Sequence, residues 1–211
     1  QTMQHLIIDF ETMSTSAYSG AVIDMAALHF DSDKFVSDDP YTLADINRVR
    51  HWKLKVAEQV TKYGYEIESA TVAFWQQQKP EVRANLKPLP TDLSVVDFAK
   101  SFHEYLIELP KIQRWWSRGN NFDPVILSRL FASAGRLNHL EEYLKYWQVR
   151  DVRTFIDAKF NFKPPLNGFC PIRDEALWDR TFKQHDCRWD VLADVLRLQT
   201  IIRAENELEM I

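Results

Sequence analysis

The sequence predicts an α/β or α+β fold in which helices cover a central sheet. Two apolar segments near the start, residues 5–10 and 21–30, have the pattern of buried strands. A further short strand is expected at residues 114–117, where Gly119 follows it. Strands at the start, helices later and one strand between the helices are typical of a sheet with helical layers.

Apolar residues at helical spacing predict five helices. These cover residues 71–78, 91–109, 123–134, 151–159 and a last segment from about residue 186 onward. Pro80 ends the first helix, and Thr91 is expected to cap the second. Residues 31–65 are polar and poorly periodic, so we expect an irregular insertion there that contains strand pieces and a loop. Residues 164–181 are expected to form a loop.

The length of 211 residues fits one domain, which we expect to span residues 1–211. Two cysteines, Cys170 and Cys187, are too few for a disulfide scaffold and fit a reducing compartment, so we expect a cytoplasmic protein. No apolar run approaches the ~18 residues of a membrane span, and the first residues lack a signal-peptide pattern. We therefore expect no membrane association.

Composition alone argues against a nucleic-acid-binding protein. The formal net charge is −4, which excludes a globally basic surface. The five glycines are scattered, so the chain contains no glycine-rich phosphate loop. Any phosphate would have to be held by individual side chains or by bound metal ions.

Asp9 and Glu11 are the first candidate metal ligands. They lie two residues apart, so in a strand both side chains point to the same face, with Cα atoms about 7 Å apart. Acids at the end of an apolar strand are costly to bury unless a positive charge compensates them, and a divalent metal ion supplies that charge. A polar strand end that faces solvent is the alternative.

Asp123 and the start of the last helix hold the other candidates. Asp123 precedes Pro124, the pattern of a helix N-cap, and the same position can direct a carboxylate into a cleft. Asp186 is the natural N-cap of the last helix, which leaves His185 on the loop and tilts the Asp190 carboxylate back toward it. A metal-binding acid beside a histidine is the arrangement that deprotonates a metal-bound water, whereas the alternative is an ordinary surface helix start.

Together these motifs resemble those of the DEDDh 3′–5′ exonucleases. The matching patterns are Asp-x-Glu on a first strand, Phe-Asp at a middle helix and His-x-x-x-x-Asp at a late helix, at residues 8–12, 121–123 and 185–190. The resemblance extends to the exonuclease A type of T-even bacteriophages and to RNase T-like bacterial exonucleases, through residues 7–13, 71–75, 118–127 and 150–154. It implies a ribonuclease H-like α/β fold, with a mixed sheet and helices on both faces.

The resemblance also implies a reaction. The four acids would bind two divalent ions, Mg²⁺ or Mn²⁺, with Asp9 bridging both, Glu11 and Asp190 on the ion that carries the attacking water, and Asp123 on the other. His185 would take the proton from that water. Nucleoside 5′-monophosphates would leave the 3′ end of single-stranded DNA or RNA, with DNA favoured by the phage-type resemblance. A phage-encoded enzyme would work in the host cytoplasm. No Cys/His cluster visible in the sequence suggests zinc.

Substrate contacts are expected near the same motifs. In the family, the residues after the first motif lie under the terminal nucleotide, which nominates Thr12 and Met13. Phe122 is a candidate to stack on a base, and Arg153 is a candidate to contact a phosphate. Core packing is the alternative for Met13 and Phe122, and pairing with Asp151 is the alternative for Arg153.

Residues 48–55 combine four basic side chains with His51 and Trp52. Interleaved basic and aromatic residues are typical of a track for a single strand, which nominates Trp52 as a nucleic-acid contact. A solvated charged face is the alternative.

Other function classes fit the motifs less well. A haloacid dehalogenase-type phosphatase needs Asp where Glu11 stands, and Met13 replaces its Thr or Val. A catalytically silent nucleic-acid-binding relative would tolerate the loss of an acid or of the histidine, yet all five residues are present. A ribonuclease H-type endonuclease shares the acids, but His185 five residues before Asp190 favours the exonuclease. An exoribonuclease of the same fold is a further alternative.

Overall fold

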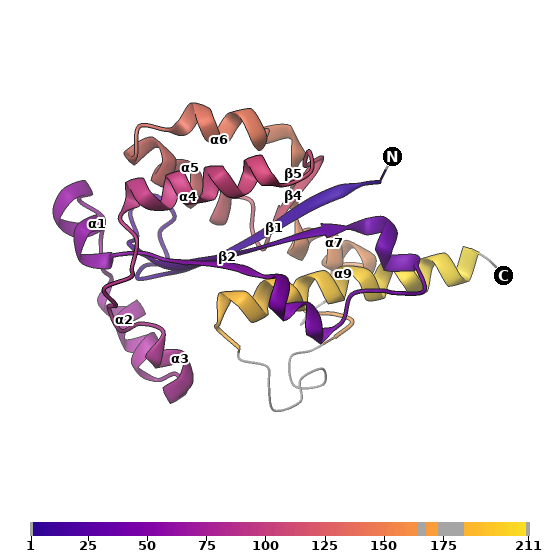
Figure 1. Cartoon of the computed structure of the whole chain (residues 1–211). Coiled ribbons are helices and arrows are strands. Elements are labelled where there is room, and N and C mark those ends of the chain that lie inside the picture. The colour runs from indigo at the N-terminus through magenta and orange to yellow at the C-terminus, as the bar shows by residue number, and fades with distance from the viewer. Residues whose placement is uncertain (1, 164–167, 173–183, 210–211) are drawn as a thin grey trace.

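The computed structural model describes residues 2–163, 168–172 and 184–209, and its centre is a five-stranded mixed sheet with helices on both faces (Figure 1). The strand order is β3-β2-β1-β4-β5. The strands are β1 (Gln4–Thr12), β2 (Val22–Asp31), β3 (Arg50–Lys53), β4 (Arg114–Ser117) and β5 (Val149–Asp151). The first three pair antiparallel, whereas β4 and β5 run parallel to β1. The predicted α/β fold with a mixed sheet is confirmed.

The central strand β1 alternates its side chains between two hydrophobic cores. One core receives every second residue of the strand: Leu6, Ile8 and Phe10. Ile7 enters the opposite core, and Asp9 and Glu11 follow it on that face because the side-chain period of a strand is two. The same alternation that buries the strand therefore places both acids on one face at its end.

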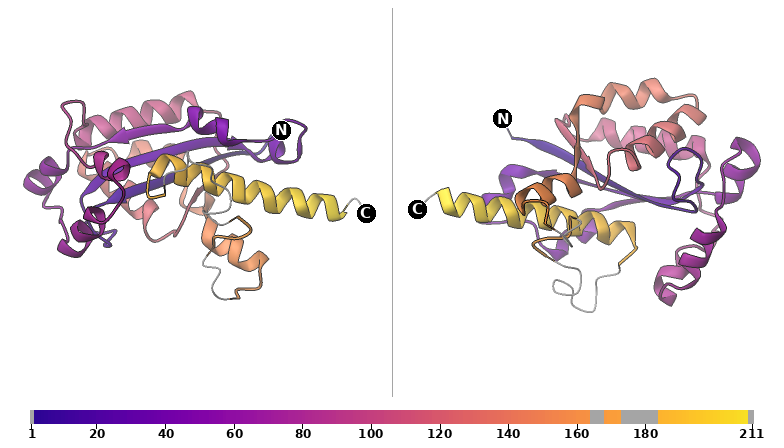
Figure 2. Two further views of the ribbon diagram at one scale, coloured as in Figure 1. Left: turned by 90° about the horizontal axis from the view of Figure 1, so that it is seen from below. Right: turned by 180° about the vertical axis from the view of Figure 1, so that it is seen from behind.

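Three helices cover the first face of the sheet (Figures 1 and 2). They are α4 (Val95–Glu108), α5 (Asp123–Ser133) and α6 (Leu137–Tyr143). The predicted cap of α4 was wrong by three residues, since Ser94 is the N-cap and its hydroxyl accepts a hydrogen bond from the Asp97 N–H. Thr91 lies outside the helix.

Helix α9 (Cys187–Glu209) covers the second face and runs across β1 and β2 (Figure 2). Its apolar residues pack on that face at three- and four-residue steps: Val191, Leu192, Val195 and Leu198. Helix α7 (Val152–Lys159) packs beside it, and the Asp151 carboxylate caps α7 by accepting from the Thr154 N–H. The loop predicted for residues 164–181 lies mostly outside the described residues.

Residues 31–65 contain more regular structure than the sequence predicts. They form the short 3₁₀ helices η1 (Ser32–Val36) and η2 (Leu43–Arg48), the edge strand β3, and helix α1 (Val56–Tyr63). Helix α1 ends at Gly64, whose positive φ of 70° suits a residue without a side chain. These elements are short, so their hydrophobic pattern covers too few residues to show a period.

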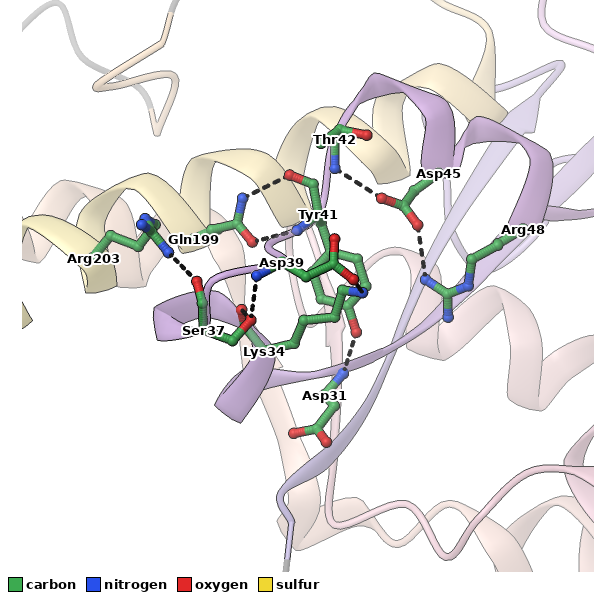
Figure 3. Close-up of polar contacts among 10 residues, drawn as sticks. All are labelled: Asp31, Lys34, Ser37, Asp39, Tyr41, Thr42, Asp45, Arg48, Gln199 and Arg203. Carbon is green, nitrogen blue, oxygen red and sulfur yellow. Dashed lines mark hydrogen bonds and ion pairs between the residues drawn. The ribbon is translucent and has the colours of Figure 1, made fainter.

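Side-chain hydrogen bonds fasten η1 and η2 to α9 (Figure 3). The Gln199 side chain accepts from the Tyr41 N–H at 2.9 Å and donates to the Tyr41 carbonyl at 2.9 Å. Arg203 of the same helix donates to the carbonyl of Ser37 at 3.0 Å. The Tyr41 hydroxyl accepts from the Asp31 N–H at the end of β2. Contacts separated by more than 150 residues thus hold α9 in place over the sheet.

Helices α2 (Ser69–Gln76) and α3 (Pro80–Ala84) lie beside the sheet, at the end of β1 that carries the acids (Figure 1). Trp75 anchors them, because its indole N–H donates to the carbonyl of Thr12 at 2.9 Å. The sequence did not predict α1, α3, α6, β5 or the 3₁₀ helix η3 (Tyr146–Gln148). Among the described helices, none has the combined length and apolar character that crossing a membrane requires.

His5 is buried between the sheet and η1 and titrates far from its ordinary range. Its Nδ1 accepts from the Trp116 indole N–H at 2.9 Å, its Nε2 lies 2.9 Å from the Ser32 hydroxyl, and its ring stacks on Phe30. Burial, followed by the nearby Arg114 guanidinium, lowers the pKa of His5 to about 4. The fold therefore holds a neutral imidazole.

We expect acid to destabilise the protein through His5. Because the folded pKa lies below the unfolded value of about 6.5, the contribution to stability is complete above pH ~6.5 and is lost as the pH falls toward 4, by about 3 kcal/mol. Urea unfolding at pH 7 and pH 4 measures this loss. A His5→Gln variant should show a smaller loss over the same interval, and equal losses in the two proteins would contradict the assignment.

Candidate active site

Three predicted acids meet where α9 crosses the end of β1. Asp9 and Glu11 come from β1, and Asp190 comes from the first turn of α9. A carboxylate oxygen from each of the three lies within 4.8 Å of the others. All three side chains are partly buried, and oxygen donors at this spacing suit a divalent cation such as Mg²⁺ or Mn²⁺.

The fourth predicted acid, Asp123 at the start of α5, is hydrogen-bonded to the same strand. It is 2% exposed, and its Oδ1 accepts a hydrogen bond from the Phe10 N–H at 3.0 Å, between the two acids of β1. The N-cap of α5 is Phe122, which makes no side-chain capping bond. The Asp123 carboxylate therefore links α5 to β1.

Removal from water and mutual repulsion raise the pKa values of these acids. Burial raises the pKa of Asp9 well above its ordinary range, and the Asp123 and Asp190 carboxylates raise it further. Glu11 is raised in the same way, first by burial and then by Asp9. Burial also raises the pKa of Asp123 to about 7, although the hydrogen bond from Phe10 opposes the shift. A divalent cation among these oxygens would relieve the repulsion, so the donor set fits a metal site.

A fifth acid, Asp194, lies one turn further along α9 and has a different role. It pairs with Arg118 at 2.5 Å and with Arg197 at 2.7 Å. Burial favours the protonated form of Asp194, but the two guanidiniums outweigh this and hold its pKa below the usual range. This buried ion-pair network was not predicted from the sequence, although the four-residue step from Asp190 places both acids on one helix face.

His185 lies at the entrance of α9 and lines a cleft next to Glu11. It has a positive φ of 65°, and the following Asp186 caps the helix by accepting from the Arg188 N–H, as predicted. The His185 ring packs edge-to-face against Phe74 of α2, with ring centroids 5.2 Å apart. His185 and helix α2 therefore lie together in the lining of the cleft that also contains Glu11.

The cleft has a volume of about 430 Å³ and joins the strand end to α2 and the start of α5. Its lining includes Glu11, Thr12, Phe74, Trp75, Phe122 and His185. Phe122, predicted as a substrate contact, lies on the cleft wall while its inner side packs on the core. Phe74 is 41% exposed and also lines the cleft. Residues 71–75 contribute to the family resemblance, but Phe74 was not predicted as a site residue.

The other predicted contacts occupy different environments. Thr12 is 7% exposed and its hydroxyl donates to the carbonyl of Ser14, whereas Met13 is half-buried against the core. Arg153 on α7 is partly buried, and its charge lowers the pKa of Asp123. Within the described part of the chain, its buried Nε has no hydrogen-bond partner.

Trp52 does not lie on a nucleic-acid track, which corrects the prediction made from residues 48–55. Its ring is 3% exposed and packs among the aromatic residues of α4: Phe98, Phe102 and Tyr105. Its indole N–H donates to the Ser101 hydroxyl at 2.9 Å. A ring packed in this way has no face on which a base can stack. Side chains alternate between the two faces of β3, so Trp52 points into the core while the basic residues on either side of it point the other way.

Comparison with known proteins identifies the family. Residues 4–196 match the model of the 3′–5′ exoribonuclease Rv2179c-like domain. The chain belongs to this family. It is also 32% identical over 220 residues to the exodeoxyribonuclease of Enterobacteria phage T4, an alignment that covers 98% of this chain and 92% of that relative. The predicted relationship to 3′–5′ exonucleases is confirmed.

Solved structures of E. coli exonuclease I have a fold similar to that of this chain. The complex with a dT13 oligonucleotide superposes with a TM-score of 0.65 at 18% identity and covers 98% of this chain. The zinc-bound complex with single-stranded DNA gives a TM-score of 0.65 at 16% identity and covers 97% of this chain. The chain spans about two-fifths of the length of those exonuclease I chains.

Neutralising one acid should stabilise the metal-free protein. An Asp190→Asn substitution removes a like charge from beside Asp9 and Glu11, so we expect a gain on the order of 1 kcal/mol in chelator, measured by urea unfolding. Mg²⁺ should then raise the melting temperature of the wild type more than that of the variant. The exposed Asp38→Asn is the matched control. Equal Mg²⁺ responses in wild type and Asp190→Asn would contradict the assignment of these ligands.

Proposed function

We propose that this chain is a metal-dependent exonuclease that removes nucleoside 5′-monophosphates from the 3′ end of single-stranded DNA. The observation that carries the proposal is the convergence of Asp9, Glu11 and Asp190 within 4.8 Å, beside a cleft that can hold the end of a strand. Family membership supports hydrolysis from the 3′ end. A long basic groove is unnecessary when only the terminal nucleotides are held, which agrees with the net charge of −4.

The four acids Asp9, Glu11, Asp123 and Asp190 are the proposed ligands of two divalent ions, Mg²⁺ or Mn²⁺. Bound ions would supply an activated water and charge stabilisation for displacement at phosphorus. The protein contributes by fixing the ligands: the alternation of β1 sets two of them, the Phe10 N–H orients Asp123, and the first turn of α9 sets Asp190.

His185 is the proposed general base. It lines the same cleft as Glu11 and lies five residues before Asp190, so an acceptor nitrogen of its ring would approach a water held by the acids. Phe74 packs against the ring edge-to-face and limits its orientation.

The cleft is the proposed binding site of the terminal nucleotide. Phe122 and the exposed Phe74 offer ring faces or edges to a base. Thr12, which lines the cleft, and the adjacent Met13, partly buried against the core, are proposed contacts after the first motif, and Arg153 supplies a positive charge near Asp123 for a phosphate oxygen.

DNA is the proposed substrate because the T4 relative, named an exodeoxyribonuclease, covers almost the whole chain. RNA is the second candidate, favoured by the description of the family model. Matched DNA and RNA oligomers in one assay distinguish the two: faster hydrolysis of DNA supports the proposal, and faster hydrolysis of RNA replaces it with the second candidate.

A 5′-labelled single-stranded oligonucleotide should give a ladder of shortened products with Mg²⁺ and none with chelator. We expect Asp123→Asn to slow ladder formation roughly 100-fold or more, because loss of several kcal/mol of charge stabilisation corresponds to such a factor. The exposed Asp38→Asn serves as the control and should keep the wild-type rate. Full activity of folded Asp123→Asn, or cleavage of a circular single strand, would contradict the proposed function.

His185→Gln should separate proton transfer from metal binding. We expect hydrolysis to fall roughly 10²–10⁴-fold, the usual contribution of a general base. The rise in melting temperature with Mg²⁺ should remain, since no acid is changed. His103→Gln, on α4 and outside the cleft lining, is the matched control. An unchanged rate in His185→Gln would show that another group takes the proton.

A further inference from the structure

A second cluster of metal-ligating side chains lies one strand away from the acids. Asp24 of β2 is opposite Glu11 in the antiparallel register, and His51 of β3 lies on the same face. Cys187, the first residue of α9, covers them. One ligand atom from each of Asp24, His51 and Cys187 lies within 4.8 Å of the other two.

The cluster is buried and one of its polar atoms lacks a partner. Asp24 is 3% exposed and Cys187 is fully buried. The Asp24 Oδ2 is 2.8 Å from the His51 Nε2, whereas Asp24 Oδ1 has no hydrogen-bond partner among the described residues. A buried carboxylate oxygen without a donor is costly, and a bound cation is one way to satisfy it.

The donor set differs in kind from the all-oxygen group of the candidate active site. One carboxylate, one imidazole and one thiol are the ligands that select Zn²⁺ or a similar thiophilic ion over Mg²⁺. Tetrahedral zinc places its ligand atoms roughly 3.3–3.6 Å apart, so the His51–Asp24 hydrogen bond would open slightly to admit the ion. On binding, the Cys187 thiol would release its proton to solvent. The negative charges of the thiolate and of the Asp24 carboxylate would then balance the 2+ charge of the ion.

We propose that Asp24, His51 and Cys187 form a zinc-type metal site separate from the exonuclease centre. The fourth position would be open to water, through a neighbouring cavity of about 490 Å³ that His51 and Arg188 line. The ion would join β2, β3 and the first residue of α9, the helix that carries Asp190. The sequence could not show this site, because its three ligands are 27 and 136 residues apart along the chain.

Titration with Co²⁺ in excess Mg²⁺ tests the site on the full chain. A thiolate-to-cobalt charge-transfer absorption appears only when a cysteine binds the ion, so the readout is independent of hydrolysis. We expect the wild type to develop this absorption with one Co²⁺ per chain, and added Zn²⁺ to abolish it. Cys170→Ser is the matched control and should behave like the wild type, as should Asp190→Asn.

Two variants locate the ligands. Cys187→Ser should lose the absorption, and His51→Ala, at a partly exposed position, should weaken Co²⁺ binding roughly 10–100-fold or more while the chain stays folded by circular dichroism. The His51 result stands even if the buried Cys187→Ser does not fold. Absence of the absorption in the wild type, its loss in Cys170→Ser, or unchanged affinity in His51→Ala would each overturn the proposal.

Discussion

Repulsion among carboxylates at the crossing of β1 and α9 is the constraint on which the site depends. Asp9, Glu11 and Asp190 are held close together in partly buried positions, and their environment opposes ionisation. A fold tolerates such an arrangement only when other contacts stabilise it. Here those contacts are the apolar residues of α9 packed on the sheet and the hydrogen bonds that fasten its second half to residues 31–48.

Two arginines compensate a further acid of α9 near the same crossing. Arg118 and Arg197 surround Asp194, one turn beyond Asp190, and neutralise the acid that would otherwise add to the repulsion. Asp9 and Glu11 instead keep raised pKa values, because burial and the neighbouring carboxylates oppose their ionisation. The protein thus combines a buried ion-pair network, which fixes α9, with a group of acids that would attract cations.

Local periodicity made much of the fold and most of the candidate site predictable. A period of two set the common face of Asp9 and Glu11, and the cap at Asp186 placed the start of the last helix. Contacts between distant segments were not predictable from local pattern. The Phe10–Asp123 hydrogen bond spans 113 residues, and Trp52 looked like a surface aromatic because its packing partners on α4 are far along the chain. Short elements such as α6 were not predicted because one or two helical turns show no clear hydrophobic period.

The central claim is that the acids on β1 and α9 bind the divalent ions that support hydrolysis. Electron paramagnetic resonance of free Mn²⁺, recorded in the same samples as release of the 3′-terminal nucleotide, tests it most directly. The account predicts that bound Mn²⁺ and the rate of release rise together in the wild type, and that folded Asp9→Asn lacks both. Wild-type release rates in Asp9→Asn, or release that saturates before any Mn²⁺ is bound, would contradict the account.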